Sequence, residues 1–256
     1  MMNGSVSPEQ MIHEDEEKLG ARIISQKTFA RLMEMGYLGI SRPKGMTKRM
    51  DSAATIEDTG APKVAIRVID NPDFDESRIP DKVRNWTALY NGAETPSLWL
   101  SGGSRSGKTV TACWITAQLI RNRITACENI RFVAVSDLVR DTWMGSGFYG
   151  DGNKWRAIQP FTKCELLVLD DLGTCVQQGK DECAVVREIA DKRWASLLPT
   201  IYTTQYGLNE YLAKLRRAGA DEHDTASLAN RILASMSNYL SQSEEAIRAH
   251  FVPMGD

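Results

Sequence analysis

From Ser97 onward, the chain alternates short apolar runs with longer stretches in which apolar residues recur at helical spacing. Four runs predict β-strands: Ser97–Ser101, Arg131–Val135, Leu166–Asp170 and Thr200–Thr204. Residues on one helical face follow the first run (Cys113, Ala117, Ile120, Ile124) and the third (Val186, Ile189, Ala190, Trp194, Leu197). Strands and helices that alternate at this length predict an α/β fold, with a parallel sheet covered by helices on both faces.

The residues ahead of this α/β part have a different pattern. We expect four segments there: a helix over Glu14–Tyr37, a flexible connector over Ser41–Asp51, a short strand over Lys63–Ile69, and a helix that Pro80 opens and that runs through Trp86 to Tyr90. The sequence therefore predicts a small, mostly helical N-terminal region over residues 1–75 and an α/β domain over residues 76–256.

Composition narrows the class of protein. A chain of 256 residues with 42% hydrophobic residues can form one sizeable core plus an appendage. The net charge of −2 means that any nucleic-acid binding must come from a local patch. The acidic N-terminus excludes a secretory signal peptide, and no stretch approaches the roughly 18 apolar residues of a membrane span. We expect a soluble, cytoplasmic protein.

The 5 cysteines form no C-x-x-C pair, and the 3 histidines form no cluster. This pattern argues against a structural zinc site and fits reduced thiols in a cytosol.

The segment Gly102–Thr109 reads G-x-x-x-x-G-K-T, the phosphate-binding loop of nucleoside triphosphatases. It follows a predicted strand and opens a predicted helix, as the motif requires. Lys108 would reach the β- and γ-phosphates, the Thr109 hydroxyl would bind Mg²⁺, and the helix N-terminus would favour the anion. An ordinary glycine turn before a helix is the alternative. The expected nucleotide contacts are Gly102, Gly103, Ser104, Arg105, Ser106, Gly107, Lys108, Thr109 and Val110.

The run Leu166–Asp171 is an apolar strand that ends in two carboxylates, the Walker B pattern. Asp170 would hold hydrated Mg²⁺ together with Thr109, and Asp171 would orient and polarise the attacking water. Many strands end in polar loops, so the run alone is weak; its place after a phosphate loop gives it meaning.

A further strand, Pro199–Gln205, also ends in polar side chains. If it neighbours the Walker B strand, Thr204 or Gln205 would touch the γ-phosphate or the lytic water. A strand followed by an ordinary polar turn accounts for the spacing equally well.

These three segments together resemble the DnaC/DnaI-type helicase loaders, AAA+ ATPases related to the IstB-type transposition ATPases. The resemblance covers about residues 78–240 and is most specific at Asp170–Gly173 and at Pro199–Ile201. It implies ATP and Mg²⁺ as cofactors, a replicative helicase and single-stranded DNA as partners, and self-association into a ring or spiral. It also implies an arginine finger for the neighbouring subunit's ATP at Arg231, which could instead be a surface salt-bridge residue.

Two positions depart from that family. Arg105 is unexpected in the phosphate loop and gives it some likeness to phage terminase motors. Gln205 stands where the sensor asparagine is usual and is one methylene longer, which puts its role in doubt.

The segment Asp141–Phe161 combines aromatic and basic residues with glycines, which suggests a mobile loop that binds single-stranded DNA. Its candidate DNA contacts are Lys154 and Arg156, while its tryptophans could equally be core anchors. The basic residues of the Ser41–Asp51 connector (Arg42, Lys44, Lys48, Arg49) could touch phosphates, although a solvated linker explains them better.

The sequence thus favours an AAA+ ATPase that binds and hydrolyses ATP and loads a replicative helicase, with Lys108, Asp171, Gln205 and Arg231 as catalytic residues and Thr109 and Asp170 as metal ligands. Two alternatives stay open: an IstB-like transposition regulator that acts on duplex DNA, and a nucleotide-gated scaffold with negligible turnover. A small-molecule kinase is a weaker third, because the sequence has no evident acceptor site.

Overall fold

The structure is a computed structural model that describes residues 56–149, 151–175, 179–237, 248 and 250–255, without the side chains of residues 143–155. The chain divides into two units, Met1–Ala53 and Ala54–Asp256, and every described residue belongs to the second. The predicted helix over Glu14–Tyr37 and the basic connector after it lie outside the described residues. Residues 56–75, which the sequence assigned to the N-terminal region, belong to the second unit.

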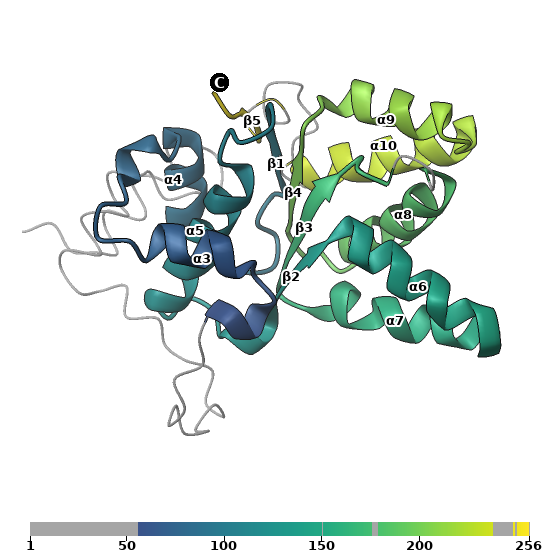
Figure 1. The fold of residues 1–256 in the computed structure, drawn as a ribbon, viewed down its shortest axis with the longest axis horizontal. Helices are drawn as coiled ribbons and strands as arrows, with labels where there is room; N and C mark the ends of the chain where they lie inside the picture. Colours follow the sequence, from purple (N-terminus) through teal and green to yellow (C-terminus); the bar gives the residue numbers. More distant parts are fainter. Residues whose placement is uncertain (1–55, 150, 176–178, 238–247, 249, 256) are drawn as a thin grey trace, which may run out of the picture. The chain divides into compact units, whose positions relative to one another are not determined.

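The described part of the chain contains a five-stranded parallel sheet, which confirms the predicted fold class (Figure 1). Its strands are β1 (Leu98–Ser101), β2 (Ile130–Ala134), β3 (Leu166–Leu172), β4 (Thr200–Thr204) and β5 (Phe251–Pro253), in the spatial order β2-β3-β4-β1-β5. Strand β4 pairs with both β1 and β3. Gln205, which follows β4, is therefore next to the strand that leads into the phosphate loop and next to the Walker B strand.

Helices cover both faces of the sheet. One layer contains α3 (Lys63–Ile69), α4 (Asp81–Ala88) and α5 (Lys108–Arg121), and the other contains α6 (Val135–Tyr149), α7 (Asp151–Lys163), α8 (Gly179–Ala195), α9 (Leu208–Arg217) and α10 (Glu222–Met236) (Figure 1). Three short 3₁₀ turns, η1 (Ile56–Thr59), η2 (Glu76–Arg78) and η3 (Cys127–Asn129), complete the connections.

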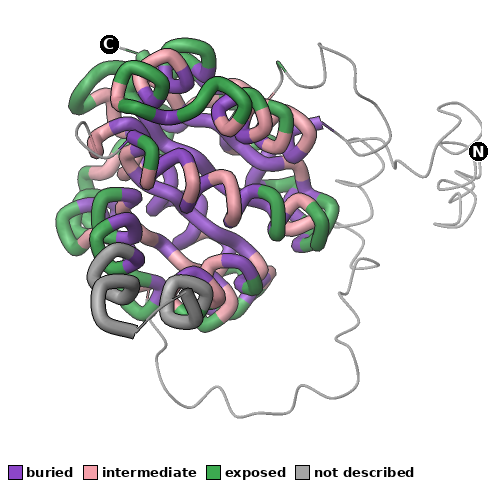
Figure 2. The backbone as a smooth tube through the Cα atoms, turned by 90° about the vertical axis from the view of Figure 1, so that its right-hand side faces the viewer, coloured by how far each residue is buried: buried purple, intermediate pink, exposed green. Residues whose placement is uncertain are grey.

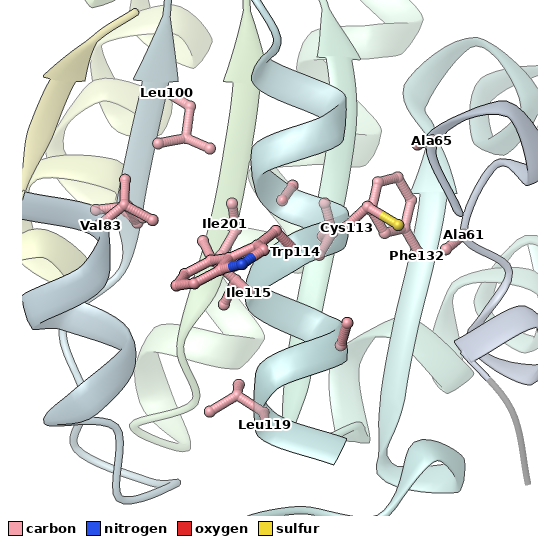
Figure 3. Close-up of a cluster of buried hydrophobic side chains, with 14 of the residues drawn as sticks. Ala61, Ala65, Val83, Leu100, Cys113, Trp114, Ile115, Leu119, Phe132 and Ile201 are labelled. Carbon is pink, nitrogen blue, oxygen red and sulfur yellow. The ribbon is translucent and has the colours of Figure 1, made fainter. Parts of the chain in front are cut away.

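Two apolar clusters fill the space between the sheet and these layers, because successive strand residues face opposite sides. Leu166 and Val168 of β3 belong to the cluster under α3, α4 and α5, part of which is drawn in Figure 3. Leu167 and Leu169 belong to the cluster under α6 to α10. All four are fully buried, and Figure 2 shows buried backbone in the interior of the described part with exposed residues around it.

A buried arginine joins the starts of β3 and β4. The Arg193 side chain, 1% exposed, donates hydrogen bonds to the Thr200 hydroxyl at 2.9 Å and to the Cys164 carbonyl at 2.7 Å. It also donates to the Pro199 carbonyl. Burial lowers the pKa of the Arg193 guanidinium. These bonds fix the two strands against each other at the end opposite the polar strand ends.

The predicted strand over Lys63–Ile69 is wrong, because these residues form the helix α3. Ala65, Ile66 and Ile69 face the core, whereas Val64 is 75% exposed. The heptapeptide is apolar enough to fit either spacing, and packing against α5 selects the helical one.

The mobile loop expected over Asp141–Phe161 is also wrong in the described residues, which form most of α6 and α7. Glycines are tolerated within helices when tertiary packing compensates for their low helix propensity. No helix in the described ranges is long and apolar enough to cross a membrane.

Candidate functional site

The phosphate loop joins the end of β1 to the start of α5. Gly102 has φ of 156°, and a Cβ there would lie 2.6 Å from the Met254 carbonyl oxygen, so only glycine fits. Gly107 is the N-cap of α5 with φ of 86°, and no side chain caps the helix. The first backbone N–H groups of a helix lack intrahelical partners, so this uncapped end can bind an anion. The predicted strand–loop–helix context is confirmed.

Lys108 points into the loop itself. Its ammonium donates hydrogen bonds to the Gly102 carbonyl at 2.8 Å, the Gly103 carbonyl at 2.6 Å and the Ser106 hydroxyl at 3.2 Å. The residue is 8% exposed, and burial lowers the pKa of its ammonium, while Asp171 and Asp170 act in the opposite direction. A buried cation beside the uncapped N-terminus of α5 complements the negative charge of a polyphosphate.

The remaining loop residues surround this cation. Gly103, Ser104 and Arg105 are exposed, whereas Ser106 and Val110 are half-buried. Arg105 has φ of 67°, a left-handed conformation that non-glycine residues seldom adopt. The structure therefore keeps a positively charged side chain at a strained position of the loop.

Thr109 and Asp170 are brought together from the two predicted motifs. The Thr109 hydroxyl lies 2.9 Å and 3.2 Å from the two Asp170 carboxylate oxygens. Asp170 is 6% exposed, and burial raises the pKa of its carboxyl, an effect that hydrogen bonds from Thr203 and Thr109 oppose. A hydroxyl and a carboxylate are the oxygen ligands that Mg²⁺ accepts beside phosphates and water, so the pair fits this ion.

Asp171 follows at the same edge of the sheet, half-buried and with φ of 62°. Its N–H donates a 2.9 Å hydrogen bond to the Thr203 hydroxyl, and its carbonyl accepts a 2.8 Å hydrogen bond from Thr174. Thr203 also donates a 2.6 Å hydrogen bond to Asp170. Thr203 was not among the predicted site residues, because only the pairing of β4 with β3 brings its hydroxyl to the Asp170 carboxylate and the Asp171 N–H.

The two candidates at the end of β4 differ in accessibility. Thr204 is fully buried and donates its hydroxyl to the Leu172 carbonyl at 2.9 Å. Gln205 is exposed. Of the pair, Gln205 is therefore the side chain that a ligand can reach, and Thr204 joins β4 to β3.

Arg231 lies on α10 and contacts α8. Its guanidinium is 2.5 Å from an Asp191 carboxylate oxygen and 4.3 Å from the centre of the Trp194 ring. The Arg231 side chain is 35% exposed. Both contacts are with residues of α8, and neither is with the phosphate loop.

Of the candidate DNA contacts, the structure describes the side chain of Arg156 only. Arg156 is exposed on α7. Lys154 and the tryptophans Trp143 and Trp155 lie on α6 and α7, but their side chains are outside the described part of the structure.

A protein-family model described as IstB-like ATP binding protein matches residues 62–250. Among solved structures, that of DnaI is similar with a TM-score of 0.52 and 19% identity, covering 76% of this chain and 92% of that one. The structure of the DnaC helicase loader has a TM-score of 0.40 and 20% identity, covering 67% of this chain and 84% of that one. No curated protein matches this chain significantly. The likeness to DnaI, at 19% identity, is a likeness of fold and agrees with the α/β architecture described above.

Proposed function

This chain belongs to the IstB-like ATP-binding protein family, and we propose that it hydrolyses ATP to load a replicative DNA helicase onto single-stranded DNA. The observation that carries the ATPase part is the contact between Thr109 and Asp170, with a hydroxyl–carboxylate distance of 2.9 Å. It joins the phosphate loop to the Walker B strand in the arrangement that a metal–nucleotide site needs.

Lys108 and the first N–H groups of α5 would hold the β- and γ-phosphates. Thr109 and Asp170 would hold Mg²⁺, which when bound neutralises charge on the phosphate oxygens. Asp171 would accept a proton from the attacking water, and Gln205 would help to orient that water. The buried position of Lys108 and Asp170 supports these roles, because charges act more strongly where water is excluded.

We propose self-association into a ring or spiral, with Arg231 at the subunit interface. Within one chain Arg231 contacts Asp191 and Trp194 on α8, and in the assembly its guanidinium would reach the ATP of the neighbouring subunit. An arginine supplied in this way stabilises the charge that develops on the transferred phosphoryl group.

The helicase-loading role rests on the resemblance of the three motifs to DnaC/DnaI-type loaders, together with the exposed Arg156 as a candidate DNA contact. We place the protein in the cytoplasm, where replicative helicases act. A transposition regulator that acts on duplex DNA is the second candidate, and the description of the matching family model favours it.

The test is ATP hydrolysis by the purified full-length protein, alone, with single-stranded DNA, with duplex DNA and with candidate replicative helicases. Lys108→Ala should remove turnover, whereas Lys82→Ala, at an exposed lysine of α4, should not. Retention of a helicase on closed circular single-stranded DNA, dependent on this protein and ATP, would support loading. Stimulation by duplex DNA alone would favour the transposition regulator, and tight ATP binding without turnover under all conditions would leave a nucleotide-gated scaffold.

A further inference from the structure

The irregular end of β3 and the residue after it, Asp171–Gly173, are called the Asp171 turn below; this segment is strained and must be held by its surroundings. Asp171 has φ of 62°, which costs an L-amino acid about 1–2 kcal/mol. Gly173, two residues later, has φ of 86°, and a Cβ there would lie 3.0 Å from the Tyr206 ring. A water-activating carboxylate on such a turn keeps its direction only if neighbouring groups fix the backbone.

Among the described residues, four side chains bond to the backbone of this turn. Thr203, Thr174 and Thr204 bond to Asp171 and Leu172, and all three lie on β4 or directly after the turn. The fourth is Glu182, whose carboxylate accepts a 2.7 Å hydrogen bond from the Gly173 N–H. Glu182 is the one of the four that lies on a helix, α8, and it connects the turn to another layer of the fold.

Glu182 is an unusual residue to find at this position. It is fully buried, and the same carboxylate oxygen accepts a 3.0 Å hydrogen bond from the Tyr211 hydroxyl of α9. Burial raises the pKa of the Glu182 carboxyl, while the hydrogen bonds from Gly173 and Tyr211 oppose the rise. A buried carboxyl is costly, and an apolar residue of similar size would fill the space without that cost. What an apolar residue could not do is accept these two hydrogen bonds.

We propose that Glu182 is a positioning residue for hydrolysis, which acts by fixing the turn that aims the Asp171 carboxylate. Its bond to Tyr211 extends the effect, because α9 begins at Leu208, directly after the segment that carries Gln205. One carboxylate therefore sets the end of β3 against the chain that leaves β4. This inference rests on the ATPase function proposed above.

The test compares Glu182→Ala, Glu182→Gln and Tyr211→Phe with Glu188→Ala, the same change at a half-buried glutamate of the same helix. Glu182→Ala should lower kcat about 10- to 100-fold, because small misplacements of a catalytic group have effects of this size. KM and nucleotide affinity should stay near the wild-type values, since Lys108 and Thr109 are not touched. Glu182→Gln keeps the acceptor oxygen and should retain most of the activity, and Tyr211→Phe should lie between the two. Glu188→Ala should behave as the wild type.

Hydrogen exchange of the Gly173 amide provides a readout that does not depend on turnover. Exchange should be faster in Glu182→Ala and close to the wild-type rate in Glu182→Gln and Glu188→Ala. A Glu182→Ala protein with wild-type kcat, or with unchanged exchange at Gly173, would overturn the proposal. If Glu182→Ala does not fold, equal kcat values for Tyr211→Phe and the wild type would overturn it instead. If the wild-type protein itself shows no turnover, the ATPase proposal fails, and the exchange rates still decide whether Glu182 holds the turn.

Discussion

The hydroxyl of Thr203 donates a 2.6 Å hydrogen bond to the carboxylate of Asp170. The same hydroxyl accepts the N–H of Asp171 at 2.9 Å, so one side chain of β4 fixes both acidic residues at the end of β3. The relationship depends on β4 lying between β1 and β3, and it makes Thr203 a direct target for substitution.

Thr203→Val should leave both acidic residues less firmly held. It keeps the shape of the side chain but removes the hydroxyl that bonds to the Asp170 carboxylate and to the Asp171 N–H. We expect the free energy of unfolding to fall by about 1–3 kcal/mol, the cost of leaving buried polar groups without a partner. The pKa of Asp170 should rise further, since the bond from Thr203 lowers it, so Mg²⁺-dependent nucleotide binding should be lost at a higher pH than in the wild type. Urea unfolding and binding titrations measure both effects. Thr203→Ser keeps the hydroxyl, so its stability and the pH dependence of its nucleotide binding should stay close to those of the wild type. Equal changes in Thr203→Ser and Thr203→Val would show that the hydroxyl is not responsible.

Lys108 should make nucleotide binding sensitive to alkaline pH. The pKa of its ammonium lies below the ordinary value of 10.5, so the cation that attracts the phosphates is lost earlier, as the pH rises, than for an exposed lysine. We expect the affinity for ATP to fall as the pH rises through this lowered pKa, in an alkaline range that begins below the one for an ordinary lysine. Lys108→Ala should bind about 10- to 100-fold more weakly at neutral pH, the range for a hydrogen bond to a charged group, and its residual binding should not change with pH over this range. The same pH dependence in Lys108→Ala would assign the titration to another group.

Substitution of the two Walker B carboxylates, Asp170 and Asp171, should have different effects on binding and on turnover. Asp170→Asn should weaken the Mg²⁺-dependent part of nucleotide binding, because Asp170 is the carboxylate bonded to Thr109. Asp171→Asn should leave binding intact and lower turnover about 100- to 10,000-fold, the range for loss of a general base. Affinity measured with and without Mg²⁺, beside steady-state phosphate release, distinguishes the two. A reversed pattern would exchange the roles assigned here.

Arg231 should act on the neighbouring subunit. Arg231→Ala should bind ATP normally and lose about 1,000-fold or more of the turnover of the assembled protein. Mixing Arg231→Ala with Asp171→Asn should restore part of the activity, because the first supplies an intact ATP site and the second an intact arginine. Arg78→Ala, at an arginine whose side chain is 83% exposed, is the control for loss of a surface charge. Unchanged turnover in Arg231→Ala, or no recovery on mixing, would leave Arg231 as a structural partner of Asp191 and Trp194 only.

Arg105 allows strain and charge to be separated. Its φ of 67° penalises every residue with a Cβ, so Arg105→Gly should be more stable than Arg105→Ala by about 1 kcal/mol. Both variants lack the guanidinium, and both should bind ATP more weakly than the wild type if Arg105 contacts the phosphates. Unfolding without nucleotide and ATP titrations measure the two effects separately. Wild-type affinity in both variants would remove Arg105 from the binding residues.

The local motifs were predictable from the sequence because their chemistry depends on neighbours along the chain. The loop Gly102–Thr109 needs glycines, a lysine and a following helix at fixed offsets, and all of these lie within one short segment of the chain. The strand around Leu166 was predictable because buried parallel strands are often continuously apolar. The strand that begins at Thr200 was predictable because it consists of β-branched and aromatic residues, which favour strands.

Short or ambiguous segments were not predictable in this way. The residues Lys63–Ile69 fit both a strand and a helix, and only contact with α5 selects the helix. The glycine-containing stretch of α6 and α7 reads as a loop from its composition, yet packing on β2, β3 and α8 stabilises helices there. In both cases tertiary contacts outweigh a weak local preference.

The sequence by itself determined that this chain has a phosphate loop, a Walker B strand and a parallel α/β core, because each depends on local spacing and on apolar periodicity. The tertiary structure decided what lies between the motifs. The strand order brings the Thr203 hydroxyl to the Asp170 carboxylate and the Asp171 N–H, and α8 brings Glu182 to Tyr211 and Asp191 to Arg231. These contacts join residues that are distant along the chain, so they depend on which surfaces pack together, and no local pattern records that choice.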